Sequence, residues 1–281
     1  MIGTQRTPSA LIIVAGLCCL APFDARPVLA DSLLVSLPNV RNGSHEHEWD
    51  RVNIPSLYSS ASVYDPVRNR MIVLGGVSVT EYNALILGLE LDGSPAWRRL
   101  SESQSLARLG HSAVYDPVRD RVIVFGGFVG GYFNCVLPTD TWAIGFSTPL
   151  TVAALPTEGE PPPGRLRHVA IYDSQHDRMI VFGGNDILEE CSYIKCRCYR
   201  RPHYNDTWSL SLAGVPTWSQ LEVQGTPPPI PSSGEGVGEY DPLRRRMLYL
   251  QGGSLWSLSL DGVPTWTALD VPGTPIFGFV K

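Results

Sequence analysis

The sequence predicts an all-β protein built from four copies of one structural unit. Three observations support this prediction: the chain repeats a segment of its own sequence, turn-forming residues are frequent, and long helical runs are lacking. Glycine and proline number 27 and 24 among 281 residues, and 7 tryptophans and 11 tyrosines provide large side chains for a core.

The repeated segment consists of a strand, a turn and a second strand. Its tyrosine occurs at positions 64, 115, 172 and 240. In the second copy, Asp116-Pro117 predicts a turn, because proline presets φ and aspartate bonds to the backbone ahead of it. Residues 121–125 are β-branched or aromatic after the leading arginine, as expected of a strand buried on both faces, and Gly126-Gly127 ends that strand.

Two further strands complete each unit. The third begins with Asp-Thr-Trp at residues 140–142 and again at 206–208. The fourth carries Trp97, Trp218 or Trp266, whereas the second copy has Thr151 near that position. Four short antiparallel strands in a repeated unit predict the blades of a β-propeller, with the tryptophans filling the wedge between neighbouring sheets.

The amino-acid pattern of the repeat resembles the kelch repeat. Tyr-Asp-Pro-x-Arg-x-Arg followed by an apolar run and Gly-Gly, and later Asn-Asp-Thr-Trp at 205–208, is similar to bacterial secreted kelch proteins over about residues 47–270. The resemblance implies a kelch-type β-propeller with four complete four-stranded blades.

A partial fifth blade is expected from the chain ends. Kelch propellers usually close about five to seven blades by pairing the two ends. Here Ser32–Leu37 and Trp49–Val52 precede the four units, and only Ile276–Lys281 follows them. Either the ring closes imperfectly or the chain is a shortened version of a longer protein. We favour the second, because an open blade exposes unpaired strand edges.

Residues 1–30 are typical of a secretory signal peptide. Arg6 precedes an apolar stretch at 10–21, and Val28-Leu29-Ala30 fits a cleavage site. The stretch is shorter than the roughly 20 apolar residues of a membrane span, although an uncleaved signal anchor is the alternative. We therefore expect residues 31–281 to form the propeller domain of a secreted or periplasmic protein. Its charge would be one unit more negative than the −5 of the full chain, which argues against nucleic acid as a partner.

Four cysteines fall on loops of two adjacent units. Cys135 follows the second Gly-Gly doublet, and Cys191, Cys196 and Cys198 follow the third. In an exported protein this pattern predicts two disulfide bonds. Cys196 and Cys198 are too close in sequence to pair, so we expect Cys135 to bond one of them and Cys191 the other. A metal site is the alternative, but the spacing matches usual zinc sites poorly.

The third loop, residues 185–204, also carries a basic and aromatic patch. In kelch proteins, the loops after Gly-Gly and the links between blades open on the usual binding face. We expect the patch to bind a protein or carbohydrate ligand, either an acidic partner protein or an anionic glycan. A solvated loop without a ligand is the alternative. The predicted binding residues are Lys195, Arg197, Tyr199, Arg200, Arg201 and His203.

No catalytic residue and no cofactor are predicted. The nucleophile-elbow, zinc-protease, P-loop and dinucleotide motifs are absent from the sequence. His45 and His47 would share one strand face but lack further metal ligands. His111 and His168 recur at one position of the repeat, which favours a structural role. We expect a non-enzymatic binding module; the alternatives are a propeller enzyme similar to the copper radical oxidases and a truncated propeller without independent activity.

Overall fold

The computed structural model describes residues 33–35, 50–52, 59–76, 84–131, 134–191, 196–229 and 236–270. For residues 33–35, 50–52, 131, 134–135, 187–191 and 196–202 the description covers the backbone alone. The chain divides into two units, Met1–Ser56 and Leu57–Lys281, and each is described by itself.

The first unit contains one antiparallel pair of strands. Strand β1 (Leu33–Val35) pairs with β2 (Asp50–Val52) in the register Leu33–Val52. Both lie within the segments predicted to contribute to a fifth blade, which confirms that these segments form strands. The other predicted contribution, residues 276–281, lies outside the described residues.

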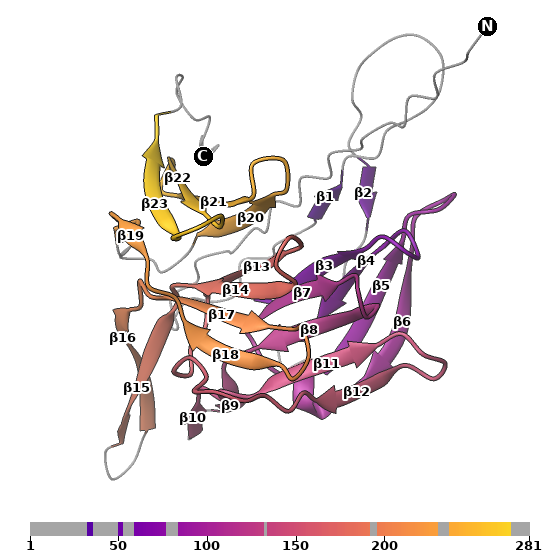
Figure 1. Cartoon of the computed structure of the whole chain (residues 1–281). Coiled ribbons are helices and arrows are strands. Elements are labelled where there is room, and N and C mark those ends of the chain that lie inside the picture. The colour runs from indigo at the N-terminus through magenta and orange to yellow at the C-terminus, as the bar shows by residue number, and fades with distance from the viewer. Residues whose placement is uncertain are drawn as a thin grey trace, which may run out of the picture. The chain divides into compact units, whose positions relative to one another are not determined.

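The described part of the second unit contains four large sheets, in each of which four consecutive blade strands pair antiparallel in up-and-down order (Figure 1). This confirms the prediction of four complete four-stranded blades. Blade 1 consists of β3 (Ala61–Asp65), β4 (Arg70–Leu74), β5 (Leu85–Glu90) and β6 (Ala96–Glu102); blade 2 of β7 (Ser112–Asp116), β8 (Arg121–Phe125), β11 (Thr141–Gly145) and β12 (Thr151–Ala154); blade 3 of β13 (Val169–Asp173), β14 (Arg178–Phe182), β17 (Thr207–Ser211) and β18 (Thr217–Gln220); blade 4 of β20 (Val237–Asp241), β21 (Arg246–Gln251), β22 (Ser254–Ser259) and β23 (Thr265–Leu269).

Three kinds of segment are added to the blades. A short 3-10 helix, η1 (Gln104–Leu106), lies between blades 1 and 2. Two hairpins follow the second strands of blades 2 and 3: β9 (Val129–Gly131) with β10 (Asn134–Val136), and β15 (Asn185–Cys191) with β16 (Cys196–His203). Strand β19 (Gln224–Gly225) belongs to the link after blade 3 but pairs in parallel with β23, the outer strand of blade 4.

Each first turn is built by the aspartate that ends the first strand. Asp65 Oδ1 accepts hydrogen bonds from the backbone amides of Val67 and Arg68, both at 3.1 Å. The residue before the second strand then adopts a left-handed conformation, with φ of 45° at Asn69 and 48° at Asp120. Asparagine and aspartate tolerate this region better than other side chains, which explains why the repeat places them there.

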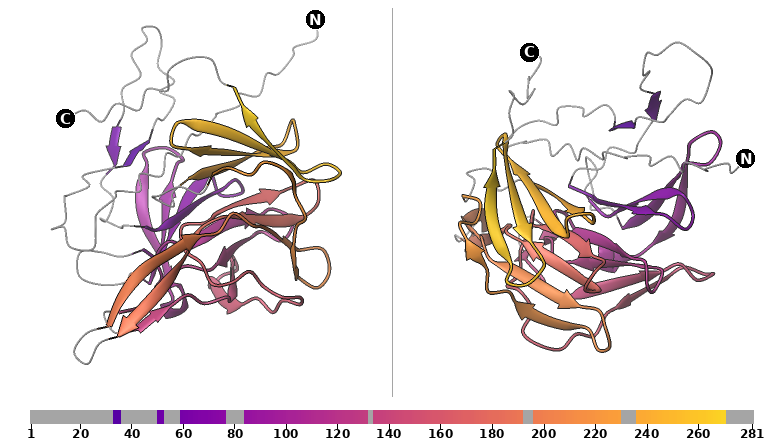
Figure 2. Two further views of the ribbon diagram at one scale, coloured as in Figure 1. Left: turned by 90° about the vertical axis from the view of Figure 1, so that its left-hand side faces the viewer. Right: turned by 45° about the horizontal axis from the view of Figure 1, so that its top comes forward.

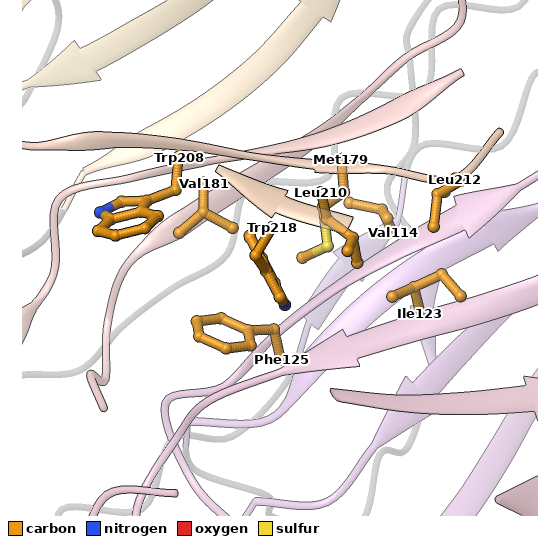
Figure 3. Packing of buried hydrophobic residues seen from close by; sticks show 9 residues of the cluster. All are labelled: Val114, Ile123, Phe125, Met179, Val181, Trp208, Leu210, Leu212 and Trp218. Carbon is orange, nitrogen blue, oxygen red and sulfur yellow. The ribbon is translucent and has the colours of Figure 1, made fainter. Parts of the chain in front are cut away.

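Neighbouring blades pack through continuous apolar layers. The first strands β3, β7, β13 and β20 contact one another in that order, and Figure 2 shows the four sheets following in chain order. Between blades 2 and 3, Trp218 is 2% exposed and its ring centroid lies 4.8 Å from that of Phe125. This confirms the predicted wedge role for Trp218, and Trp266 packs in the same way against Phe182 between blades 3 and 4. Trp97 of blade 1 is not part of the described cluster between blades 1 and 2. The cluster drawn in Figure 3 comprises Val114, Ile123, Phe125, Met179, Val181, Trp208, Leu210, Leu212 and Trp218.

The links that precede blades 3 and 4 run alongside the outer strand of the following blade. Glu158 forms a parallel bridge to Thr217, and β19 does the same with β23. Gly225, with φ of 77°, lies so close that a Cβ atom there would stand 2.1 Å from the carbonyl oxygen of Trp266. Only glycine combines this backbone angle with this approach.

Ion pairs join the first three blades at their turns. Arg68 forms a bidentate pair with Asp120 of the next blade, and Arg119 forms the same pair with Asp177. The hydrogen bond from Arg68, together with that from Tyr115, holds the pKa of Asp120 down at about 2. At the corresponding positions of blades 3 and 4 the sequence has His176 and Arg245, so this pair is not repeated there.

Candidate interaction surface

The two edges of the blades differ in how much chain they carry. We call the edge that holds the Gly-Gly doublets and the links the loop rim, and the edge that holds the Asp-Pro turns the turn rim. The doublets lie at residues 75–76, 126–127, 183–184 and 252–253. Because strands alternate in direction, every insertion after a doublet emerges on the loop rim. Both hairpins, β9–β10 and β15–β16, are such insertions (Figures 1 and 2).

Arg108 anchors the loop rim of blade 2. Its side chain is buried and donates hydrogen bonds to the carbonyl oxygen of Gly126 at 3.0 Å and that of Ser105 at 2.7 Å. It also donates to the carboxylate of Asp140 at 2.8 Å. These acceptors come from the Gly-Gly doublet, from the link and from the residue before β11. One guanidinium therefore holds three chain segments together.

Arg165 makes the same connections in blade 3. It donates to the carbonyl of Gly183 at 2.9 Å and to Asp206 at 2.6 and 2.9 Å. Its guanidinium also lies 4.3 Å from the ring centroid of Tyr204, which directly follows β16. Burial alone would raise the pKa of Asp206, but the hydrogen bonds from Arg165 and Trp208 keep that pKa below its usual value. Asp206 is thus charged at neutral pH and forms a permanent ion pair.

Among the described residues, these anchors occur in blades 2 and 3, which are also the blades with a described hairpin on the loop rim. The positions of Arg108 and Asp140 are held by Leu57 and Leu85 in blade 1, and by Ser233 and Ser254 in blade 4. Both members of the pair are therefore replaced together. This is physically expected, because a buried charge left without its partner is strongly destabilising. The anchors brace the base of each hairpin, a role that our sequence analysis did not identify.

The predicted binding patch lies on the longer hairpin. Five of its members belong to β16, and the backbone register places Arg197 opposite Glu190, Tyr199 opposite Leu188 and Arg200 opposite Ile187. His203 ends β16 opposite Asn185. Arg201 also lies in β16, whereas Lys195 lies outside the described residues.

The segment that we expected to be a long loop is therefore a β-hairpin. Its first strand carries Asp186, Glu189 and Glu190, so acidic and basic residues lie on paired strands. The predicted binding patch included residues of the basic strand and none of these acidic residues. Opposite charges across a strand pair stabilise it, which explains why a segment rich in charge forms a hairpin here.

The four predicted disulfide cysteines lie on the same two hairpins. Cys135 is in β10, Cys191 ends β15, and Cys196 and Cys198 are in β16. Strands β10 and β15 contact each other, so the hairpins of blades 2 and 3 are neighbours on the loop rim.

His111 and His168 are buried beside the Gly-Gly doublets of the loop rim. Each is about 5% exposed, and Nε2 of His168 lies 2.7 Å from the hydroxyl of Ser112. Burial, assisted by Arg108, lowers the pKa of His111 to about 3, and burial also holds the pKa of His168 well below its usual value. Both imidazoles are neutral at physiological pH. This burial fits the structural role that their recurrence predicts.

Metal and membrane features are absent from the described part of the chain. In those residues, no three His, Cys, Asp or Glu side chains gather as a metal site. No described helix has the length and apolar character needed to cross a membrane. His45 and His47, singled out in the sequence, lie outside the described residues.

Comparison with known proteins agrees on the architecture. Residues 65–274 match the family model of the KLHDC2/KLHL20/DRC7 Kelch-repeats domain. Dynein regulatory complex subunit 7 of Chlamydomonas reinhardtii is 36% identical over 73 residues, which are 26% of this chain and 5% of that protein. The chain therefore spans only a small part of that relative. A solved structure titled "Structure of YjhT" matches with a TM-score of 0.56 at 12% identity, covering 79% of this chain and 67% of that chain. At that identity the likeness concerns the fold alone.

Proposed function

Because this chain belongs to the kelch-repeat family, we propose that it is an exported, non-catalytic module that binds a protein or carbohydrate ligand on its loop rim. Kelch domains commonly act in protein interaction, and this supports binding as the general role. The finer parts of the proposal are export, the choice of rim and the chemistry of the ligand. Export rests on the signal-like residues 1–30 and on the four cysteines.

The two rims differ in the chain segments that they carry, and the choice of the loop rim as the binding surface rests on this difference. On the turn rim, the four blades repeat nearly the same short turn, with little room for specificity. On the loop rim, the part of the chain that the structure describes has hairpins on two adjacent blades, and the buried Arg–Asp anchors lie in those same blades. Binding sites are concentrated on loops that a rigid scaffold positions, and these anchors supply the rigidity.

The composition of β16 indicates the class of ligand. Arg197, Arg200 and Arg201 lie on one short strand of an otherwise acidic chain. Strand β15 contacts β10 of the neighbouring hairpin, and the arginines lie on its partner strand, β16. Arginine is favoured where carboxylate or sulfate groups are bound, because its planar donors match them in pairs. We therefore propose an acidic protein surface or an anionic glycan as the ligand.

Charge reversal of β16 tests this proposal. The full chain and its Arg197→Glu/Arg200→Glu/Arg201→Glu variant would be measured for binding to immobilised heparin and to immobilised poly-glutamate by surface plasmon resonance. We expect the variant to bind one of these probes about tenfold or more weakly, a change of at least about 1.4 kcal/mol. The probe that responds identifies the ligand class.

A matched control separates the surface from net charge. The Arg98→Glu/Arg99→Glu/Arg244→Glu variant makes the same change in charge at three exposed positions away from β16. This variant should keep the affinity of the unmodified chain. Equal losses in both variants, or no binding to either probe by the unmodified chain, would contradict the choice of β16 as the binding strand.

A further inference from the structure

The register of the β15–β16 hairpin distinguishes between the possible cysteine pairings. Cys191 and Cys196 stand directly opposite each other, and Cys198 stands opposite Glu189. Directly opposite residues of antiparallel strands have Cα atoms about 4.5–5.5 Å apart, inside the window of about 4.4–6.8 Å that a disulfide needs. Cys191 and Cys198 are diagonal neighbours, about 7–8 Å apart, which lies outside that window.

The other candidate partners of Cys191 are less compatible with the fold. Pairing Cys191 with Cys135 would leave Cys196 and Cys198 to bond each other. Two residues apart on one strand are separated by about 6.8 Å, whereas a disulfide needs Cβ atoms about 3.5–4.5 Å apart. That bond would require β16 to lose its extended conformation. The contact between the two hairpins joins β10 with β15, so it does not place Cys198 of β16 beside Cys135.

We infer that the loop rim holds a disulfide, Cys191–Cys196, within the hairpin of blade 3. This bond links the end of β15 to the start of β16. The inference deepens the proposed function, because it rests on export and describes how the binding hairpin is held in place.

The chemistry is thiol–disulfide exchange with a small or protein disulfide of an oxidising compartment. A cysteine thiolate attacks the donor disulfide and forms a mixed disulfide, and one donor sulfur leaves as a thiolate. The second cysteine thiolate then displaces the other donor sulfur. For each bond formed in the chain, two cysteine thiols lose two electrons and two protons, and one donor disulfide is reduced to two thiols.

A direct test is possible because trypsin places each of these four cysteines on a different peptide. Cleavage after Arg121, Arg165, Arg178, Lys195, Arg197 and Arg200 places Cys135 on peptide 122–165, Cys191 on 179–195, Cys196 on 196–197 and Cys198 on 198–200. The full chain would be secreted into the periplasm of an expression host. It would then be alkylated without reduction, digested at mildly acidic pH to prevent exchange, and examined by mass spectrometry.

The expected spectrum contains peptide 179–195 linked to 196–197. A link between 179–195 and either 198–200 or 122–165 would overturn the pairing. A protein that contains one zinc ion per chain, and whose cysteines become alkylated only after a chelator removes that zinc, would also overturn the pairing. That result would indicate a metal site. The variant Cys135→Ser/Cys198→Ser should retain the 179–195 link, whereas Cys196→Ser should lose it.

The same digest separates this inference from the proposed function. Protein refolded in a mixture of reduced and oxidised glutathione tests the pairing even if the chain is not exported, because the register is a property of the fold. Correct links without binding to heparin or poly-glutamate would leave the pairing standing and count against the proposed ligand. Incorrect links with intact binding would overturn only the pairing.

Discussion

The buried histidines show how one repeat position becomes a packing element. His168 receives a partner from Ser112 of the preceding blade, whereas the corresponding residue for His111 is Ala61, which offers no hydroxyl. His111 instead packs against the Gly-Gly turn of blade 1, where a Cβ on Gly75 would stand 2.9 Å from its Cε1 atom. Neutral imidazoles suit these sites, since burial opposes their protonation.

Stability should therefore fall when the solution is acidified through the range in which free histidine gains a proton. The unfolded chain binds that proton near pH 6.5, while folded His111 has a pKa of about 3. Between these values the unfolded state binds more protons, so each buried histidine costs about 1.4 kcal/mol per pH unit. Urea unfolding from about pH 7.5 to 5 should show this slope.

The control for that measurement is His111→Ser, because serine occupies the same position in blade 1 as Ser60. The variant should lose one histidine's share of the pH slope while keeping a cooperative transition. Asp120, with a pKa of about 2, protonates only at lower pH and does not contribute in this range. Identical slopes for the two proteins would show that His111 is not buried as a neutral group.

At the scale of elements, two glycines allow the cost of a close backbone approach to be compared with the cost of a left-handed backbone angle. Gly225 and Gly214 have nearly equal φ angles of 77° and 74°, but only Gly225 lies against another strand. Gly214→Ala should cost about 1 kcal/mol, the price of the left-handed angle alone. Gly225→Ala should cost at least about 2 kcal/mol more, because β19 must move away from Trp266. Equal losses in denaturant unfolding would show that the β19–β23 contact contributes nothing.

The sequence predicted those elements that depend on local pattern. Four blades, their turns and their wedge tryptophans follow from the spacing of Asp-Pro, Gly-Gly and Trp along the chain. The anchors were missed because they are contacts between distant residues: Arg108 and Asp140 are 32 residues apart, and Arg165 and Asp206 are 41 apart. A signal was present, since Arg-x-x-His and Asp-Thr-Trp occur together in the same two repeats. The hairpin was missed because charged residues mask strand alternation.

At the scale of the whole propeller unit, blade 4 lacks the Arg–Asp ion pair that joins blades 1–3 at their turns. The bidentate pairs Arg68–Asp120 and Arg119–Asp177 have no counterpart between blades 3 and 4, where Arg245 pairs with Asp261 of its own blade. We expect native-state hydrogen exchange to show that β21 and β22 open at lower free energy than β8 and β14. Equal protection of all four blades would contradict this.

A designed pair can test the cause of that difference. His176→Arg with Arg245→Asp would restore the missing ion pair, and Asp is also better suited to the φ of 49° at this position. The double variant should slow exchange in blade 4 several-fold, about 1 kcal/mol for a partly exposed bidentate pair. Arg245→Asp alone measures the backbone effect, and equal protection in the single and double variants would rule out the ion pair as the cause.

The links that clasp the following blade have a consequence for how such a chain can grow or shrink. Because β19 leaves blade 3 yet bonds to the outer edge of blade 4, the repeat visible in the sequence is not an independent piece of the fold. A gene duplication or deletion with breakpoints between β19 and β20, or at the tight turns 213–216 and 261–264, would separate β19 from the strand of blade 4 that it covers. Breakpoints between β18 and β19 would carry the link strand together with that outer edge. Recombination that preserves folding should therefore cut the chain before the link strand and not after it.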